Sequence, residues 1–182
     1  GKGFLDSITA LQFPGEWNGT VSTVKYTEGL NIGYRWYDAQ QKSGACATND
    51  DGSNACVAFP FGHGLSYTAF SATTPTLAAS GAKQVVKTTV TNTGAKAGAE
   101  VVQVYLGLPA VSSVGDKTGV TLVQPPKRLV GFQKVSLAKG ASSEVTITID
   151  PDATNHPMSV WNQTTKKWEI PSGTFTVYVG KS

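Results

Sequence analysis

Catalysis requires nucleophiles, acids or bases held together, and the run Gly62-His63-Gly64-Leu65-Ser66-Tyr67 is the first candidate for such a group. A dinucleotide-binding loop would need a third glycine at Tyr67 and a helix after it. A nucleophile elbow would need a glycine at Thr68. Strand-like sequence follows instead, so neither pattern is met. His63 has no evident carboxylate to orient it as a base, and we interpret His156 as a solvated loop residue.

Acidic residues are the second source of chemistry, because glycoside hydrolysis uses two carboxylates about 5–5.5 Å apart for retention or about 6.5–9.5 Å apart for inversion. The chain has 12 acidic residues, so counting alone excludes no pair. Most of them lie in turns or beside glycine, as do Asp50, Asp51, Asp116, Asp150 and Asp152. We interpret them as solvated loop carboxylates and assign no catalytic residue. The 2 histidines and 2 cysteines likewise lead us to expect no metal site and no cofactor.

The two cysteines, Cys46 and Cys56, are separated by a polar segment rich in Ser, Asn, Asp and Gly. A disulfide between them would close a short loop and contribute roughly 2–3 kcal/mol in the loop-entropy model. Free thiols or half of a zinc site are the alternatives, but zinc takes four ligands and usually a closer cysteine spacing. We predict the disulfide, and with it a secreted, extracellular or periplasmic location, because disulfides persist in oxidising compartments.

Two N-x-Thr sequons begin at Asn18 and Asn162. Such motifs are acceptors for N-linked glycans when a eukaryote secretes the protein. Both asparagines are therefore predicted glycosylation sites under that condition.

The elements that would position these residues are strands. Runs with alternating or β-branched residues are separated by Gly, Pro and Asn turns, and the clearest alternation is Val145-Thr146-Ile147-Thr148-Ile149. Strands are predicted over residues 65–77, 85–91, 100–108, 129–137, 145–149, 158–161, 168–170 and 174–179. About seven short strands are typical of an immunoglobulin-like or fibronectin type III-like sandwich. We therefore predict an all-β domain over residues 58–182.

Residues 1–57 show no strand rhythm, and we expect an irregular N-terminal extension or interdomain linker. They hold an aromatic cluster from Tyr34 to Tyr37 and an exposed polar loop over residues 40–54. Trp161 and Trp168 flank a polar turn in the second part. For this pair we favour core or interface packing over a sugar-stacking platform.

Charge and length exclude several classes of protein. The net charge is +3 and the basic residues form no stripe, so we expect no nucleic-acid partner. No apolar run approaches the ~20 residues of a membrane-spanning helix, so we expect no membrane partner. A (β/α)₈ barrel usually takes ~250 residues, more than this chain has.

The most specific motif of the chain is Phe59-Pro60-Phe61-Gly62-His63-Gly64-Leu65-Ser66-Tyr67-Thr68. This run resembles the C-terminal part of glycoside hydrolase family 3, which includes β-glucosidases and β-xylosidases. Further segments before and after this run also match, and they occur in the family's order, at residues 26–30, 33–38, 91–94, 98–105, 129–132 and 171–175. The segment that holds the two cysteines is longer than the family pattern.

The resemblance implies a terminal fibronectin type III-like domain, preceded by the tail of an α/β sandwich domain. In that family the nucleophile is an Asp on a (β/α)₈ barrel, and the acid/base is commonly a Glu on the α/β sandwich domain. Both lie upstream of the matching region, so no catalytic residue is carried over to this chain. We expect an excised, cleaved or separately encoded tail that is inactive alone.

The expected role is a non-catalytic accessory domain that docks on the upstream catalytic domains and stabilises them. The residues expected to dock are Tyr34, Arg35, Trp36, Tyr37, Phe59, Phe61, His63 and Tyr67. Arg35 would pair with a carboxylate of those domains or, alternatively, with the nearby Asp38. Two other functions stay open, namely a stand-alone module that binds polysaccharide or lignin and an enzyme active in isolation. A row of exposed aromatics on one sheet face would favour the module.

Overall fold

The computed structural model describes residues 15–50, 52–109 and 124–180. Its secondary structure is almost entirely strand, with one short helix, α1, at Tyr34–Lys42. The strands are β1 Glu16–Trp17, β2 Ser22–Thr23, β3 Phe70–Ala72, β4 Thr76–Ser80, β5 Lys83–Asn92, β6 Gly98–Gly107, β7 Arg128–Leu137, β8 Ser142–Ile149, β9 Val160–Asn162, β10 Lys167–Glu169 and β11 Thr176–Val179.

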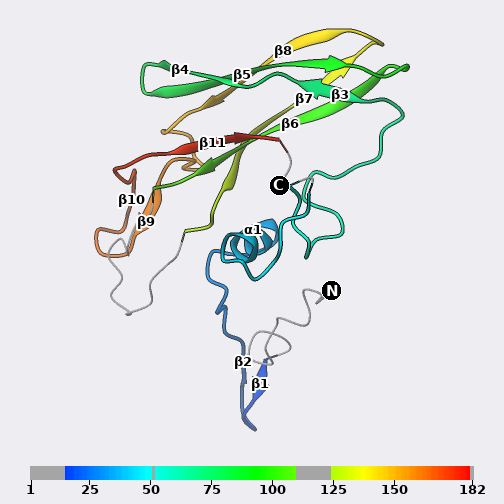
Figure 1. Ribbon diagram of the computed structural model, residues 1–182. Coiled ribbons are helices and arrows are strands. Elements are labelled where there is room, and N and C mark those ends of the chain that lie inside the picture. Colours follow the sequence, from blue (N-terminus) through cyan, green and yellow to red (C-terminus); the bar gives the residue numbers. More distant parts are fainter. Residues whose placement is uncertain (1–14, 51, 110–123, 181–182) are drawn as a thin grey trace.

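Seven of the strands form two antiparallel sheets that pack face to face (Figure 1). In the four-stranded sheet, β5 pairs with β3 and β4 along one edge and with β8 along the other. The other sheet has the order β11-β6-β7. The predicted all-β sandwich of about seven strands is confirmed.

Alternating apolar side chains from both sheets fill the space between them. In β8, Val145, Ile147 and Ile149 are buried while the intervening threonines are exposed, as the period of two predicts. The buried core consists of Val86, Val90, Val102, Val104, Leu106, Leu137, Val145, Ile147 and Ile149. Because this core lies wholly within residues 86–149, the sandwich has a hydrophobic core of its own.

Asn92, at the end of β5, is a fully buried polar residue with all its hydrogen bonds made. Its Oδ1 accepts from the Thr68 hydroxyl at 2.6 Å and from the Gly94 N–H at 3.1 Å. Its Nδ2 donates to the carbonyls of Lys96 at 2.7 Å and Leu137 at 3.1 Å. Since an unpaired buried amide is costly, this network fixes the place where the chain enters the sandwich.

Two expectations for the first part of the chain were wrong. Residues 34–42, expected to be irregular, form α1, and the polar loop expected from residue 40 therefore begins only after this helix. The first sandwich strand begins at Phe70 rather than at residue 65, because its partner, Asn92, lies at the very end of β5. Residues 65–69 thus have no place in the sheet.

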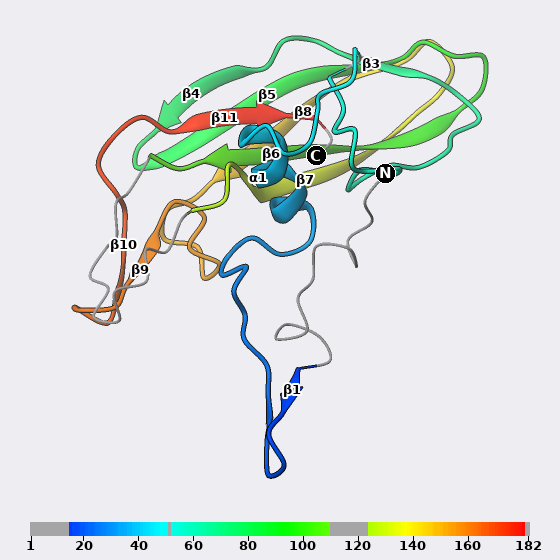
Figure 2. The ribbon, with the colours of Figure 1, turned by 60° about the horizontal axis from the view of Figure 1, so that its bottom comes forward.

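The N-terminal hairpin β1–β2 projects away from the sandwich in both views (Figures 1 and 2). Its register pairs Glu16 with Thr23 and Trp17 with Ser22. Exposed large apolar residues occur in the hairpin and in the segment between it and α1, namely Trp17, Val21, Val24, Tyr26, Leu30 and Ile32. In the described part of the chain, no helix has the length and apolar character needed to cross a membrane.

The second hairpin, β9–β10, brings Trp161 and Trp168 together as a cross-strand pair with ring centroids 5.5 Å apart. Both side chains remain partly exposed, so neither belongs to the buried core. His156, interpreted above as a solvated loop residue, is half-buried and stacks on Trp168 with centroids 4.6 Å apart. The three rings pack on one another because the turn before β9 folds back over the hairpin.

Candidate functional site: an aromatic groove on the sandwich

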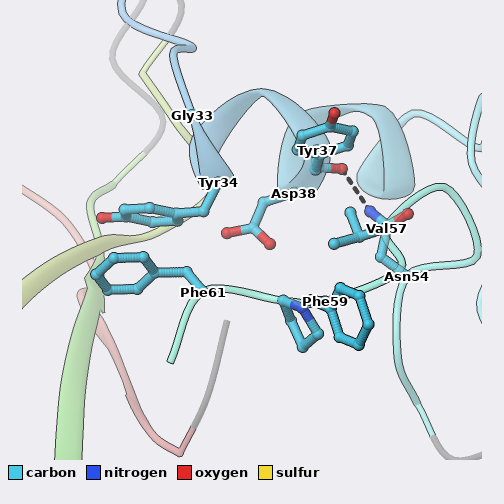
Figure 3. A pocket seen from close by; sticks show the side chains of 9 residues that line it. Gly33, Tyr34, Tyr37, Asp38, Asn54, Val57, Phe59 and Phe61 are labelled. Atoms are coloured by element: carbon cyan, nitrogen blue, oxygen red, sulfur yellow. Dashed lines mark hydrogen bonds between the residues drawn. The ribbon is translucent and has the colours of Figure 1, made fainter. Parts of the chain in front are cut away.

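A groove of about 260 Å³ lies between α1 and the segment that leads into the sandwich (Figure 3). We call it the aromatic groove, since four aromatic rings contribute to its wall. Its lining residues are Gly33, Tyr34, Tyr37, Asp38, Asn54, Val57, Phe59, Pro60 and Phe61. Figure 3 shows the Tyr34 and Phe61 rings facing each other at one end and Phe59 at the other.

Tyr34 attaches α1 to the outer face of the three-stranded sheet. Its hydroxyl oxygen accepts a 2.7 Å hydrogen bond from the backbone N–H of Leu129, next to the start of β7. Its ring stacks on Phe61 at 5.2 Å and meets the edge of the buried Tyr105 ring at 5.7 Å. Tyr34 therefore joins the helix, the groove and the sheet in one contact.

Gly62 allows the chain to pass directly over β6. Its φ of 88° lies in the left-handed region that favours glycine. A Cβ at this position would overlap the side-chain amide of Gln103, which also accepts a hydrogen bond from the Tyr105 hydroxyl. The glycine in the Phe-Gly-His segment is therefore required by close packing on the sheet.

The predicted disulfide lies beside Asn54 and Val57, which line the groove. The structure joins Cys46 to Cys56 with their Cα atoms 5.7 Å apart. Between them, Thr48 and Asn54 form an isolated antiparallel bridge. The Asn54 Nδ2 donates a 2.7 Å hydrogen bond to the Tyr37 carbonyl (Figure 3). The disulfide loop is thus held against α1 and supports the groove.

The structure brings most of the predicted docking residues together. Tyr34, Tyr37, Phe59 and Phe61 line the groove. Trp36 packs edge-on against Tyr37 with centroids 5.0 Å apart, and the His63 ring lies 5.0 Å from that of Phe59. Tyr67 lies apart, 94 % exposed, with the Lys96 ammonium 6.0 Å from its ring. Their docking role itself remains a prediction.

Charged residues flank the groove. Asp38 is buried, and its carboxylate lies 3.5 Å from the Lys127 ammonium. Lys127 also lies 5.5 Å from the centre of the Tyr105 ring. The Arg35 guanidinium lies 5.8 Å from the centre of the Tyr34 ring, and no ion pair of Arg35 occurs within residues 15–50, 52–109 and 124–180. The structure therefore does not form the local Arg35–Asp38 pair considered above.

Arg128 holds the turn that precedes β9. Its Nε and Nη2 donate to the Pro157 carbonyl, at 3.0 and 2.6 Å, and its Nη2 also donates to the carbonyls of His156 and Ser159. Burial first, and then the positive charge of Arg35, lowers the pKa of Arg128 to about 10. Arg128 thus stays a cation at neutral pH, in an environment that disfavours the charge.

Two carboxyl groups of the described residues have lowered pKa values. Hydrogen bonds from Lys83 hold the pKa of Asp150 below its ordinary value, and those from Asn162 and Thr165 do the same for Glu169. A general acid working near neutral pH needs a raised carboxyl pKa, so these two groups are not suited to that role. No group of three or more His, Cys, Asp or Glu in the described part of the chain is placed to hold a metal ion.

The two sequons differ in accessibility. Asn18 lies exposed in the turn of the β1–β2 hairpin, where its Oδ1 accepts from the backbone N–H groups of Thr20 and Val21. Asn162 is only 9 % exposed, and its Nδ2, the atom that would carry a glycan, donates to Glu169 at 2.8 Å. Glycosylation at Asn18 remains a prediction, whereas a glycan on Asn162 would require opening of the β9–β10 hairpin.

Sequence reasoning missed the residues of the sheet on which the extension packs. The extension packs on Tyr105, Gln103 and the N–H of Leu129. These residues occupy ordinary strand positions, so nothing in their local sequence indicates that they bind another segment. Arg128 could have been noticed in the sequence, because Arg35 and Arg128 are the only arginines among 15 basic residues. Arginine is the preferred residue for planar recognition of carboxylates, so this pair could have been found.

The fold and site define a β-sandwich with an N-terminal extension packed on one sheet, and comparisons assign this architecture to a class. Residues 100–182 match the family model of the fibronectin type III-like domain. Among solved structures, a β-glucosidase from Streptomyces venezuelae in complex with D-glucose superposes with a TM-score of 0.71 at 34 % identity, over 96 % of this chain and 19 % of that one. A family 3 β-glucosidase from Bifidobacterium adolescentis superposes with a TM-score of 0.68, also at 34 % identity, over 94 % of this chain and 21 % of that one.

Curated relatives lead to the same region. An exo-α-(1→6)-L-arabinopyranosidase from Bifidobacterium breve is 36 % identical over 91 % of this chain and 19 % of its own length. β-Glucosidase B from Emericella nidulans is 36 % identical over 93 % of this chain and 18 % of its own length. The chain thus carries a fibronectin type III-like domain homologous to the C-terminal part of glycoside hydrolase family 3 enzymes, and it spans about a fifth of their length.

Proposed function

We propose that the chain is the non-catalytic C-terminal accessory region of a family 3 β-glycosidase of the β-glucosidase type, docking on the catalytic domains and stabilising them. The observation that carries the proposal is the apolar surface of residues 15–67. Phe59 is 72 % exposed and Tyr67 94 % exposed, and the projecting hairpin adds Trp17 and Tyr26. Soluble monomers rarely leave large apolar patches uncovered.

The energetics favour a partner for this surface. Burying one large apolar side chain contributes roughly 1.5–3 kcal/mol. Several aromatic residues of the extension are exposed, so the isolated chain lacks the stabilisation that burying each of them against a partner would contribute. Aromatic residues with a nearby arginine are also the usual anchors of protein interfaces. The homologous enzymes, which are about five times longer, supply further domains as partners.

Two features refine the proposal. The Cys46–Cys56 disulfide supports a secreted, extracellular or periplasmic enzyme. No sugar is assigned, because the relatives' names include both an arabinopyranosidase and β-glucosidases. Binding of polysaccharide or lignin by a stand-alone module is less well supported. On the outer face of the three-stranded sheet, the exposed Phe132 and Tyr178 lie on the two strands that flank β6. Phe132 is opposite Gln103 and Tyr178 is opposite Tyr105, so the two rings are at different levels and do not form a row across the sheet.

The test uses a joined enzyme, in which this chain replaces the homologous C-terminal fifth of the Streptomyces venezuelae β-glucosidase. The same host truncated before that region is the control. We expect the joined enzyme to unfold at a higher temperature than the truncated host, because docking buries apolar surface. The isolated chain should not hydrolyse aryl β-glucosides or aryl β-xylosides. A joined enzyme no more stable than the truncated host, or turnover by the isolated chain that is lost on mutating one of its own acids, would reject the proposal.

A further inference from the structure

The only two arginines of the chain lie next to the contact that joins α1 to β7. The chain has 15 basic residues, and all except Arg35 and Arg128 are lysines. Arg35 lies over the ring of Tyr34, whose hydroxyl binds the N–H of Leu129, the residue after Arg128. The charge of Arg35 is felt at Arg128, where it helps to lower the pKa. A bound anion would offset the repulsion between these two like charges.

The hydrogen bonds of Arg128 leave one edge of its guanidinium without a partner. Nε and Nη2 donate to backbone carbonyls of the turn before β9. Nη1 donates to no atom of the described residues. Carbonyl oxygens orient the guanidinium but do not neutralise its charge. Arg128 is therefore a fixed, half-buried cation with two N–H donors still available.

Arg35 has even less local support. It lies in the first turn of α1, where the helix dipole disfavours a cation, and this turn holds no acidic residue. The nearest carboxylate on the same helix, that of Asp38, lies 3.5 Å from Lys127. Lys127 is thus the ion-pair partner of that buried carboxylate. Both arginines therefore lack an anionic partner within residues 15–50, 52–109 and 124–180.

We propose that Arg35 and Arg128 form a receptor for a carboxylate side chain of the catalytic domains. This inference rests on the proposed function, and it adds the chemistry of one contact. A guanidinium presents its donors in a planar fork that matches a carboxylate, which lysine cannot do. Tyr34 lines the groove and also contacts Arg35, so a segment that covers the aromatic groove would carry its carboxylate onto the two arginines.

The receptor can be tested on the chain itself, with acetate as the probe. A ¹⁵N-labelled chain has only two arginine Nε–H resonances, and Arg35→Lys assigns them. Sodium acetate and sodium chloride are titrated at equal ionic strength. We expect saturable shifts of both resonances with acetate and not with chloride, and a severalfold smaller acetate shift of Arg128 in Arg35→Lys. Equal responses to both salts would overturn the receptor.

The occupant is tested by comparing Arg35→Gln in two backgrounds, with Lys139→Gln as the control that removes an exposed charge. In the isolated chain, Arg35→Gln should leave the melting temperature unchanged or raise it, because repulsion with Arg128 is removed. In the joined enzyme the same change should lower the melting temperature by several degrees. A similar fall in both backgrounds would show that Arg35 stabilises only its own helix, and would overturn the proposal.

The remaining outcomes separate the two proposals. Suppose that acetate shifts the arginine resonances but Arg35→Gln leaves the melting temperature of the joined enzyme unchanged. This result would overturn the proposal that the carboxylate belongs to the catalytic domains, and it would assign the receptor to a free acidic ligand. A joined enzyme no more stable than the truncated host would reject the docking function. In that case the acetate titration still decides whether the arginines bind a carboxylate.

Discussion

The sandwich and the N-terminal extension follow opposite patterns of burial. In the sandwich, residues such as Val104 and Ile149 are almost completely buried between two sheets. In the extension, large apolar side chains lie mostly on the surface, and one helix and one short hairpin are the regular elements of its described part. The sandwich buries its hydrophobic residues between its own sheets, whereas most large hydrophobic residues of the extension are exposed and available to pack against another surface. The difference indicates where the molecule is self-sufficient and where it needs a partner.

The junction between the two regions is nevertheless firm. Tyr34 binds β7 and the Tyr105 ring, and Gly62 lies on Gln103. The Cys46–Cys56 disulfide fixes the loop that lies between these two contacts along the chain. The groove is therefore preorganised before any partner arrives, and preorganisation lowers the entropic cost of association.

The largest expected effect comes from the core of the sandwich. Ile149→Ala removes a side chain that is only 1 % exposed, so it should lower the free energy of unfolding by about 2–5 kcal/mol. Leu77→Ala, on the exposed edge strand β4 at 54 % exposure, is the control and should cost far less. Urea unfolding of both variants measures the difference. Equal losses would mean that the two sheets do not form the stabilising core.

Reducing the disulfide should affect the extension and spare the sandwich. Opening the loop between Cys46 and Cys56 removes roughly 2–3 kcal/mol of loop-closure stabilisation. We expect faster hydrogen exchange in residues 44–57 and at the end of α1, with little change in β5 to β8. The double variant Cys46→Ser, Cys56→Ser, treated with the same reductant, is the control. A large fall in the melting temperature of the sandwich would contradict the separation of the two regions.

Trp36→Ala should have different effects in the two backgrounds. Truncating an interface anchor often costs about 2 kcal/mol or more of association. The joined enzyme should therefore lose several degrees of melting temperature, while the isolated chain, in which Trp36 is half-buried beside Tyr37, loses less. Lys139→Ala is the distant control. The same loss in both backgrounds would assign Trp36 to local packing.

The smallest effect concerns an exposed ion pair of the sandwich. The Lys83 ammonium lies 2.7 Å from the Asp150 carboxylate and lowers its pKa. A lowered carboxyl pKa stabilises the fold above the unfolded value of about 3.9, and this is lost as the pH falls through the folded value. Asp150→Asn should slightly lower the melting temperature at pH 7, and this effect should disappear as the pH falls through the lowered pKa of Asp150. A loss that persists in acid would refute the ion-pair explanation.

The sequence predicted the sandwich because its signals are local. The alternation of Val145, Ile147 and Ile149 predicts which face of β8 is buried, and this prediction needs no information about the other strands. The turn at residues 92–94 likewise marks the end of β5. The fold class, most of the sandwich strands and the disulfide could therefore be predicted from residue types and spacing.

The helix and its attachment to the sheet depend on contacts distant in sequence. In α1, Tyr34 and Tyr37 lie three residues apart, but the aromatic cluster offered too short a pattern to identify a helix. What holds the helix in place is the bond between Tyr34 and Leu129, 95 positions apart. The docking residues came from the family resemblance, and their arrangement around one groove required the structure.

The most direct test of the account is hydrogen exchange of the isolated chain against the joined enzyme. If the extension docks on the catalytic domains, protection should rise across residues 16–67, most of all at α1 and at residues 57–63 around the groove. Strands β5 to β8 should exchange at the same rate in both. Unchanged exchange around the groove, or protection confined to the four-stranded sheet, would contradict the account.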